Sequence, residues 1–180
     1  MGCTSSKIDV IVPVAVPTGM GSGDRPLAFE WEVDAKNLIK KKLIGQGSFG
    51  EVFFGTYLGS PCAIKTMLPK LQAQSKLVRQ FVDEILLMST LRHPNVVMFL
   101  GACTKVPNLS MVLEYCDHGS LHDFLKRDAK HGIKVTMSLV YRFALDIARG
   151  VYYLHRKCKV IQRDLKARNV LIDKSLNAKV

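Results

Sequence analysis

Gly45-Gln46-Gly47-Ser48-Phe49-Gly50 sets three glycines at the spacing GxGxxG, between two segments that favour strands. The segment before it, 38–44, combines apolar residues with three lysines, and the segment after it, 51–58, is rich in β-branched and aromatic side chains. A Gly-Ser-Pro turn then leads into a third such segment, 62–67. This order predicts an antiparallel hairpin with a glycine loop at its tip, followed by a third strand.

Two other interpretations of the glycine loop are open when it is taken alone. In dinucleotide-binding units the same spacing opens a helix, whose N-terminus receives the pyrophosphate. The strand-forming residues 51–57 disfavour that class, but glycines also form tight hairpins that bind nothing. Positions without a Cβ let backbone N–H groups approach phosphate oxygens, and the residues downstream favour a phosphate-covering loop.

The rest of the chain predicts two lobes with a cleft between them. Two further strands are expected at 96–103 and 109–115, joined by a Pro-Asn turn. Before them, apolar residues recur every three or four positions, which indicates one face of an amphipathic helix. That face consists of Leu77, Phe81, Ile85, Met88 and Leu91. After Gly119 we expect a short helix capped by Ser120, with Asp123 completing the cap, and a longer helix over about 136–155.

Composition excludes several classes of protein. The 180 residues carry a formal charge of +11, and their five cysteines lie at wide spacings with no CxxC pair. Neither a zinc site nor a disulfide framework is indicated, and reduced thiols in a cytoplasmic protein explain the cysteines. A chain without eighteen consecutive apolar residues is not expected to cross a membrane. The basic charge is compatible with nucleic acid, but no aromatic and basic platform is visible, so no nucleic acid is expected as a partner.

Lys65 and Glu84 form the first candidate pair of functional residues. Lys65 lies on the expected third strand, in Cys62-Ala63-Ile64-Lys65, and Glu84 lies on the helix that follows, beside the apolar Ile85. A lysine on such a strand can reach nucleotide phosphates when a carboxylate of the next helix holds it. A lone surface lysine or glutamate is usually only solvated, but here each side chain lies where the other's role requires it.

The segment Gln162-Arg163-Asp164-Leu165-Lys166-Ala167-Arg168-Asn169 is the second candidate site. Asp164 can accept a substrate hydroxyl's proton or orient that hydroxyl, and Asn169 can supply an oxygen ligand to Mg²⁺. Lys166 can neutralise charge on a transferred phosphoryl group. The alternative is a basic surface loop, which the Asp and Asn at this spacing, ahead of an apolar strand, disfavour.

Together these residues resemble a protein kinase domain over 31–180. The motifs occur in that family's order: Gly45–Val52, Ala63-Ile64-Lys65, Glu84, Leu91-Arg92-His93-Pro94-Asn95, Glu114-Tyr115 and Asp164–Asn169. The run Asp-Leu-Lys-Ala-Arg-Asn is similar to serine/threonine kinases. Phe99–Cys103 and Trp31 resemble the tyrosine-kinase-like group of these enzymes.

The resemblance implies an α+β, two-lobed kinase-like fold with ATP and Mg²⁺ as cofactors and a protein with Ser or Thr as substrate. It implies a small lobe at 31–115 with five antiparallel strands and one helix, a hinge at 116–119 and an incomplete helical large lobe at 120–180. Residues 1–30, glycine-rich near 18–24 and without a periodic apolar pattern, are expected to be a tail. It implies catalytic roles for Lys65, Glu84, Asp164, Lys166 and Asn169, with Asn169 as metal ligand. The ATP-binding residues that it implies are Ile44, Gly45, Gln46, Gly47, Ser48, Phe49, Gly50, Glu51, Val52, Ala63, Lys65, Leu113, Glu114, Cys116 and Leu171.

The sequence departs from the family's pattern in two places. Gln162 stands where the family usually has histidine, which is expected to weaken assembly more than chemistry. The Asp-Phe-Gly segment is expected about two residues past Val180, so the 180 residues alone are expected to show little kinase activity and poor solubility. These departures keep a second hypothesis open, a catalytically inactive pseudokinase-like scaffold or nucleotide-binding module.

The first six residues, Met-Gly-Cys-Thr-Ser-Ser, fit a myristoylation pattern, with Gly2 as acceptor and Ser6 at the expected position. Cys3 is placed for a palmitoyl chain, which supplies the second signal that stable anchoring needs. The alternative is an ordinary Met-Gly start. The expected location is therefore the cytoplasm, with membrane anchoring through Gly2 and Cys3.

Overall fold

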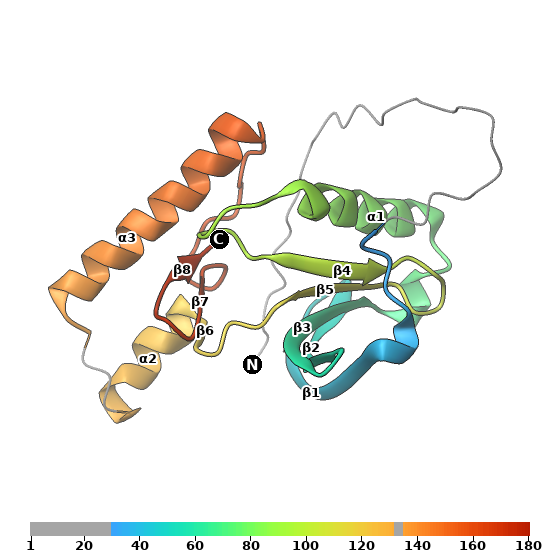
Figure 1. The fold of residues 1–180 in the computed structure, drawn as a ribbon, viewed down its shortest axis with the longest axis horizontal. Coiled ribbons are helices and arrows are strands. Elements are labelled where there is room, and N and C mark those ends of the chain that lie inside the picture. Colours follow the sequence, from blue (N-terminus) through green and yellow to red (C-terminus); the bar gives the residue numbers. More distant parts are fainter. Residues whose placement is uncertain (1–29, 132–134) are drawn as a thin grey trace.

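The computed structural model describes residues 30–131 and 135–180, and the expected N-terminal tail, with Gly2 and Cys3, lies outside the described residues. Five antiparallel strands form the first sheet in the order β1-β2-β3-β5-β4 (Figure 1). These strands are β1 (Leu38–Gln46), β2 (Gly50–Tyr57), β3 (Ser60–Met67), β4 (Phe99–Cys103) and β5 (Ser110–Glu114). The expected sheet is therefore confirmed.

Helix α1 (Ser75–Thr90) lies beside this sheet, above β4 in the view of Figure 1. Its apolar face packs on the sheet through Phe81 and Ile85, which are buried with Phe99 and Met111 in one core cluster. The helix ends at Thr90, one residue before the expected face does. Leu91 nevertheless stays buried, in a second cluster that also contains Leu154.

The second part of the chain carries a small three-stranded sheet and two helices. The sheet is formed by β6 (Gly119–Ser120), β7 (Leu171–Ile172) and β8 (Ala178–Lys179), in that order. Helices α2 (Leu121–His131) and α3 (Met137–Tyr152) flank it (Figure 1), and Phe124 and Phe143 pack with Ile172 in the core. This arrangement agrees with the expected two-lobed α+β fold.

The caps of both helices follow the sequence. The hydroxyl oxygen of Ser120 accepts a hydrogen bond from the backbone N–H of Asp123 at 3.1 Å, which confirms the expected cap. Thr136 caps α3 by accepting from the N–H of Leu139 at 3.3 Å. These bonds satisfy N–H groups that have no partner within the helix.

Two expected elements are shorter in the structure. The strand expected from 96 begins only at Phe99, because the N–H of Val97 donates to the carbonyl of Val180 instead of to a strand of the large sheet. The α-helix expected to 155 ends at Tyr152 and continues as a π-helical turn, Tyr153–Lys157. No helix in the described part of the chain is long and apolar enough to span a bilayer.

Candidate active site

The glycine loop connects β1 and β2 in a tight hairpin. The N–H of Gly47 donates to the carbonyl of Gly50 at 2.8 Å, and the amide of Gln46 reaches the Glu51 carboxylate at 3.4 Å. Phe49 stands exposed at the tip. The loop is thus closed by its own backbone and projects from the sheet, as the sequence predicts.

Two glycines of the motif meet different steric conditions. A Cβ on Gly50 would come within 2.2 Å of the carbonyl oxygen of Thr66 on the neighbouring strand β3. A Cβ on Gly45 would have Val52 at 3.6 Å as its nearest neighbour, which is an ordinary contact. Sheet packing alone therefore requires a glycine at 50, whereas the neighbouring described residues leave room for a side chain at 45.

Lys65 and Glu84 form a bidentate ion pair. The Lys65 ammonium lies 2.7 Å and 2.9 Å from the two carboxylate oxygens of Glu84. β3 pairs with β2 and β5 on either side, and Ile64 and Ile85, the neighbours of the two charged residues, are completely buried. Because both elements are fixed by these buried neighbours, the pair is held in position while Lys65 stays about one quarter exposed, at 28%.

The residues expected around adenine lie partly side by side. Val52 pairs with Lys65 across β2 and β3, and Ala63 pairs with Leu113 across β3 and β5. Leu171 lies on β7, in the other sheet, where it pairs with Ser120. The chain between the two sheets runs from the end of β5 through Cys116, the position where a hinge is expected.

Cys116 is buried in this connection. Burial raises the pKa of its thiol to about 12, with a smaller contribution from the Glu114 carboxylate. The thiol is therefore protonated at neutral pH and is a poor nucleophile. Any binding role of Cys116 falls to its backbone groups.

Asp164, Lys166 and Asn169 form one hydrogen-bonded cluster. The Lys166 ammonium lies 2.7 Å from Oδ2 of Asp164, and the Asn169 amide donates to the same oxygen at 3.0 Å and to the Asp164 carbonyl at 2.7 Å. The Lys166 bond is the main cause that holds the pKa of Asp164 below its ordinary value, with Asn169 adding to it against some desolvation. The carboxylate is therefore ionised at neutral pH and half-exposed beside a cation.

Gln162 is part of this loop's hydrogen bonding. Its side-chain oxygen accepts from the backbone N–H of Asp164 at 2.7 Å, and its backbone N–H donates to Nε2 of His155 at 3.4 Å. The residue that departs from the family's pattern thus contacts the backbone of Asp164 directly.

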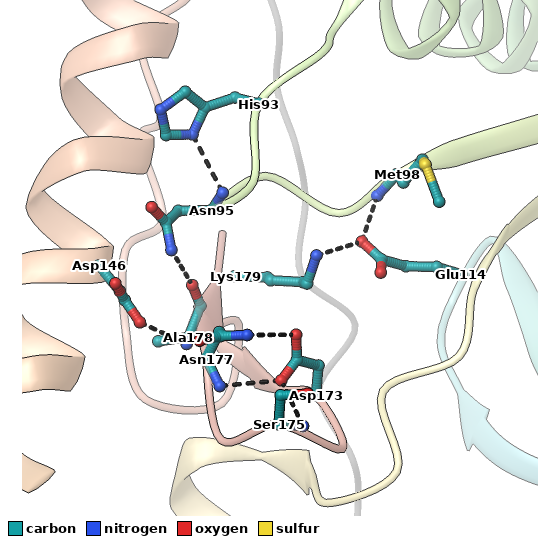
Figure 2. Close-up of polar contacts among 10 residues, drawn as sticks. All are labelled: His93, Asn95, Met98, Glu114, Asp146, Asp173, Ser175, Asn177, Ala178 and Lys179. Atoms are coloured by element: carbon teal, nitrogen blue, oxygen red, sulfur yellow. Dashed lines mark hydrogen bonds and ion pairs between the residues drawn. The ribbon is translucent and has the colours of Figure 1, made fainter.

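A set of polar residues around β8 was not predicted from the sequence (Figure 2). Lys179 forms an ion pair with Glu114 at 2.8 Å. Asn95 and Asp146 bond to the preceding Ala178, and Asp173 accepts from the N–H of Asn177. A signal was present in the sequence, since Lys179 is a charged residue between the apolar Ala178 and Val180. Its partner could not be deduced from spacing.

Among the described residues no group of three or more His, Cys, Asp or Glu side chains is arranged to hold a metal ion. Nor does any hydrogen bond or ion pair in these residues join Lys65 or Glu84 to the cluster of Asp164, Lys166 and Asn169. The two candidate groups are thus separate constellations on the two lobes.

A comparison with family models identifies the class of protein. The family model of protein tyrosine and serine/threonine kinases matches residues 38–180, so the chain belongs to this family. The matched region contains all residues of both constellations described above.

Several proteins similar to this chain are named as serine/threonine-protein kinases. The chain is 41% identical over 151 residues to serine/threonine-protein kinase STY17 of Arabidopsis thaliana, which covers 84% of this chain and 26% of that protein. It is 43% identical over 150 residues to serine/threonine-protein kinase VIK of the same plant (82% and 33%) and 41% identical over 150 residues to a probable serine/threonine-protein kinase, drkB, of Dictyostelium discoideum (83% and 21%). The chain therefore spans a third or less of the length of these relatives.

Proposed function

We propose that this protein is an ATP-dependent serine/threonine-protein kinase with a signalling role, in which the 180 residues provide the nucleotide site and the catalytic loop. The observation that carries the proposal is the bidentate Lys65–Glu84 pair, a cation fixed by a carboxylate next to the glycine-loop hairpin. A surface lysine that served only solubility would gain little from such a pair.

In this proposal the small lobe binds the nucleotide. Lys65 contacts the phosphates while Glu84 fixes its ammonium, and the backbone of the loop 45–50 covers them. Val52, Ala63, Leu113 and Leu171 enclose the adenine. Backbone groups between Glu114 and Cys116 form hydrogen bonds with its edge.

The catalytic loop orients the acceptor. The Asp164 carboxylate, ionised and partly exposed, accepts a hydrogen bond from the substrate hydroxyl. It takes the hydroxyl proton as the hydroxyl oxygen bonds to the γ-phosphorus of ATP, while the bond from that phosphorus to the β–γ bridging oxygen breaks and ADP leaves. Lys166 lies beside it and neutralises charge on the phosphoryl group. The amide nitrogen of Asn169 is used by Asp164, which leaves its amide oxygen as the atom that would hold Mg²⁺. Bound Mg²⁺ would supply charge neutralisation at the phosphates.

The first test separates nucleotide binding from transfer. Residues 1–180 are expected to bind ATP in the presence of Mg²⁺, measured by calorimetry, and a chain that continues through the rest of the kinase domain is expected to phosphorylate serine or threonine in a general protein acceptor. Binding by both chains without transfer by the longer one would favour the pseudokinase-like scaffold. No binding by either would contradict the proposal.

We also propose that the protein is acylated on Gly2 and Cys3 and works at the cytoplasmic face of a membrane. The support is the myristoylation pattern at the N-terminus with an adjacent cysteine. A single myristoyl chain binds bilayers with an association constant of about 10⁴ M⁻¹, so Cys3→Ser is expected to leave weak binding and Gly2→Ala to abolish it. Fractionation of cells that express each variant measures this. An unchanged membrane fraction for Gly2→Ala would contradict the proposal.

A further inference from the structure

The Lys179–Glu114 ion pair joins the two sheets at the expected hinge. Lys179 lies on β8, Glu114 is the last residue of β5, and their charged groups are 2.8 Å apart (Figure 2). Only 11% of the lysine side chain and 17% of the glutamate side chain are exposed. This pair is thus more buried than the Lys65–Glu84 pair and lies beside the segment that the proposed function gives to adenine.

Glu114 is held on its other side by Met98, the residue just before β4. The oxygen that accepts from Lys179 also accepts from the backbone N–H of Met98 at 2.7 Å, and the N–H of Glu114 donates to the carbonyl of Met98 at 2.9 Å. Side chain and main chain of Glu114 are therefore both fastened to Met98. Loss of the carboxylate's bond would therefore weaken the attachment of the end of β5, where the hinge begins, to Met98.

Lys179 in turn is fixed to the large lobe and to the segment before β4. The carbonyl of Ala178 accepts from the Asn95 amide at 3.0 Å, and the N–H of Ala178 donates to the buried Asp146 on α3 at 3.1 Å. The N–H of Val180 donates to the carbonyl of Asn95 at 3.0 Å. The ammonium of Lys179 is thus a positive charge at a fixed place, rather than one on a mobile strand.

Stability alone is a weak reason for such a pair. Withdrawing two charges from water costs about as much as their attraction returns, and a well-packed neutral pair is often as stable. An ion pair between two fixed elements also holds the groups bonded to it in a defined position. Here the positioned partner is the backbone of the end of β5.

We propose that Lys179 is a positioning residue for the nucleotide, which through Glu114 fixes the hinge backbone and so sets the preference for adenine over other bases. The inference rests on the proposed function, because it assigns a determinant of base selectivity to the same site. It concerns neither phosphate binding nor the catalytic loop.

A double-mutant cycle on residues 1–180 tests the proposal. The chain, Lys179→Met, Glu114→Gln and the double variant are titrated with Mg-ATP and with Mg-ITP, whose base presents a carbonyl where adenine has an amino group. Each single variant is expected to reduce the ratio of the ITP dissociation constant to the ATP dissociation constant about five- to tenfold. The double variant is expected to reduce this ratio no more than a single variant does, because the effects of coupled residues are not additive.

Glu32→Gln is the matched control. The Glu32 carboxylate also accepts a hydrogen bond from a backbone N–H beside β4, that of Thr104 at 3.0 Å. Thr104 follows the last residue of β4, whereas the partner of Glu114, Met98, precedes the first. It is expected to leave the base preference unchanged. The exchange Lys179→Glu with Glu114→Lys provides a second route if a single variant does not fold, and it is expected to recover part of the preference.

The outcomes distinguish this inference from the proposed function. If neither the unsubstituted chain nor the chain that continues through the rest of the kinase domain binds either nucleotide, both are overturned. If it binds ATP but the variants weaken ATP and ITP equally while lowering the melting temperature, the pair is only structural, and the inference is overturned while the proposed function stands. Additive single effects on base preference would likewise overturn it.

Discussion

Replacing Asp164 by asparagine is expected to lower the rate of phosphoryl transfer by about 10³-fold, within the range that a positioned general base contributes. The amide has nearly the same shape, but it cannot take the hydroxyl proton and loses its ion pair with Lys166. The dissociation constant for ATP is expected to change less than about twofold, because the fold and the nucleotide site remain. Steady-state kinetics and calorimetry on a chain that includes the whole kinase domain measure both quantities.

Asp83→Asn provides the control for this prediction, since Asp83 is an exposed aspartate on α1. The pH dependence gives a second readout. Because the pKa of Asp164 is held below its ordinary value of 3.8, protonation of this group is expected to reduce the rate only at pH values below that. Lys166→Met removes the main cause of the lowered pKa, so the acid limb should move to higher pH. A rate of Asp164→Asn close to that of Asp83→Asn would contradict the assigned role.

Replacing Lys65 by methionine is expected to lower kcat/KM by about 10²- to 10³-fold, as removal of one electrostatic stabiliser does in other enzymes. Methionine keeps most of the apolar stem but leaves the Glu84 carboxylate, which is mostly buried, without its cation. Glu84→Gln is expected to give a smaller loss, because the lysine charge stays while its position becomes less defined. Initial rates at several ATP concentrations measure both variants.

Lys70→Met is the control for Lys65→Met, since Lys70 is exposed just after β3. Thermal unfolding of each variant separates loss of charge from loss of fold. If Lys65→Met keeps most of its kcat/KM, the ion pair has a structural role only, and the proposal that Lys65 contacts phosphates fails.

Local chemistry was sufficient to predict much of the candidate site. The glycine loop follows from residues 38–58, whose strand-forming side chains and turn residues predict a hairpin without help from distant segments. The cluster of Asp164, Lys166 and Asn169 lies within six residues, so its members meet in one loop whatever surrounds it. Sequence patterns report such short-range arrangements well.

Contacts between distant segments were not predictable in the same way. The strand expected from 96 begins three residues late, because Val97 is bonded to Val180, a partner that strand propensity does not contain. The end of α3 changes to a π-helical turn where Leu154 enters a cluster with Leu87 and Val160. In both places tertiary contacts override a local preference.

The sequence by itself determined the order of elements, the glycine loop, the kinase-like motifs and the pairing of Lys65 with Glu84, because each depends on local pattern or on two adjacent elements. Only the tertiary structure decided that the carbonyl of Thr66 leaves no room for a side chain at position 50. It also decided that Gln162 bonds to Asp164 and that Lys179 lies against Glu114. The physical reason is that these contacts depend on where separate elements come to rest against each other. A charged side chain that becomes buried pairs with an opposite charge within reach, because an unpaired buried charge costs free energy.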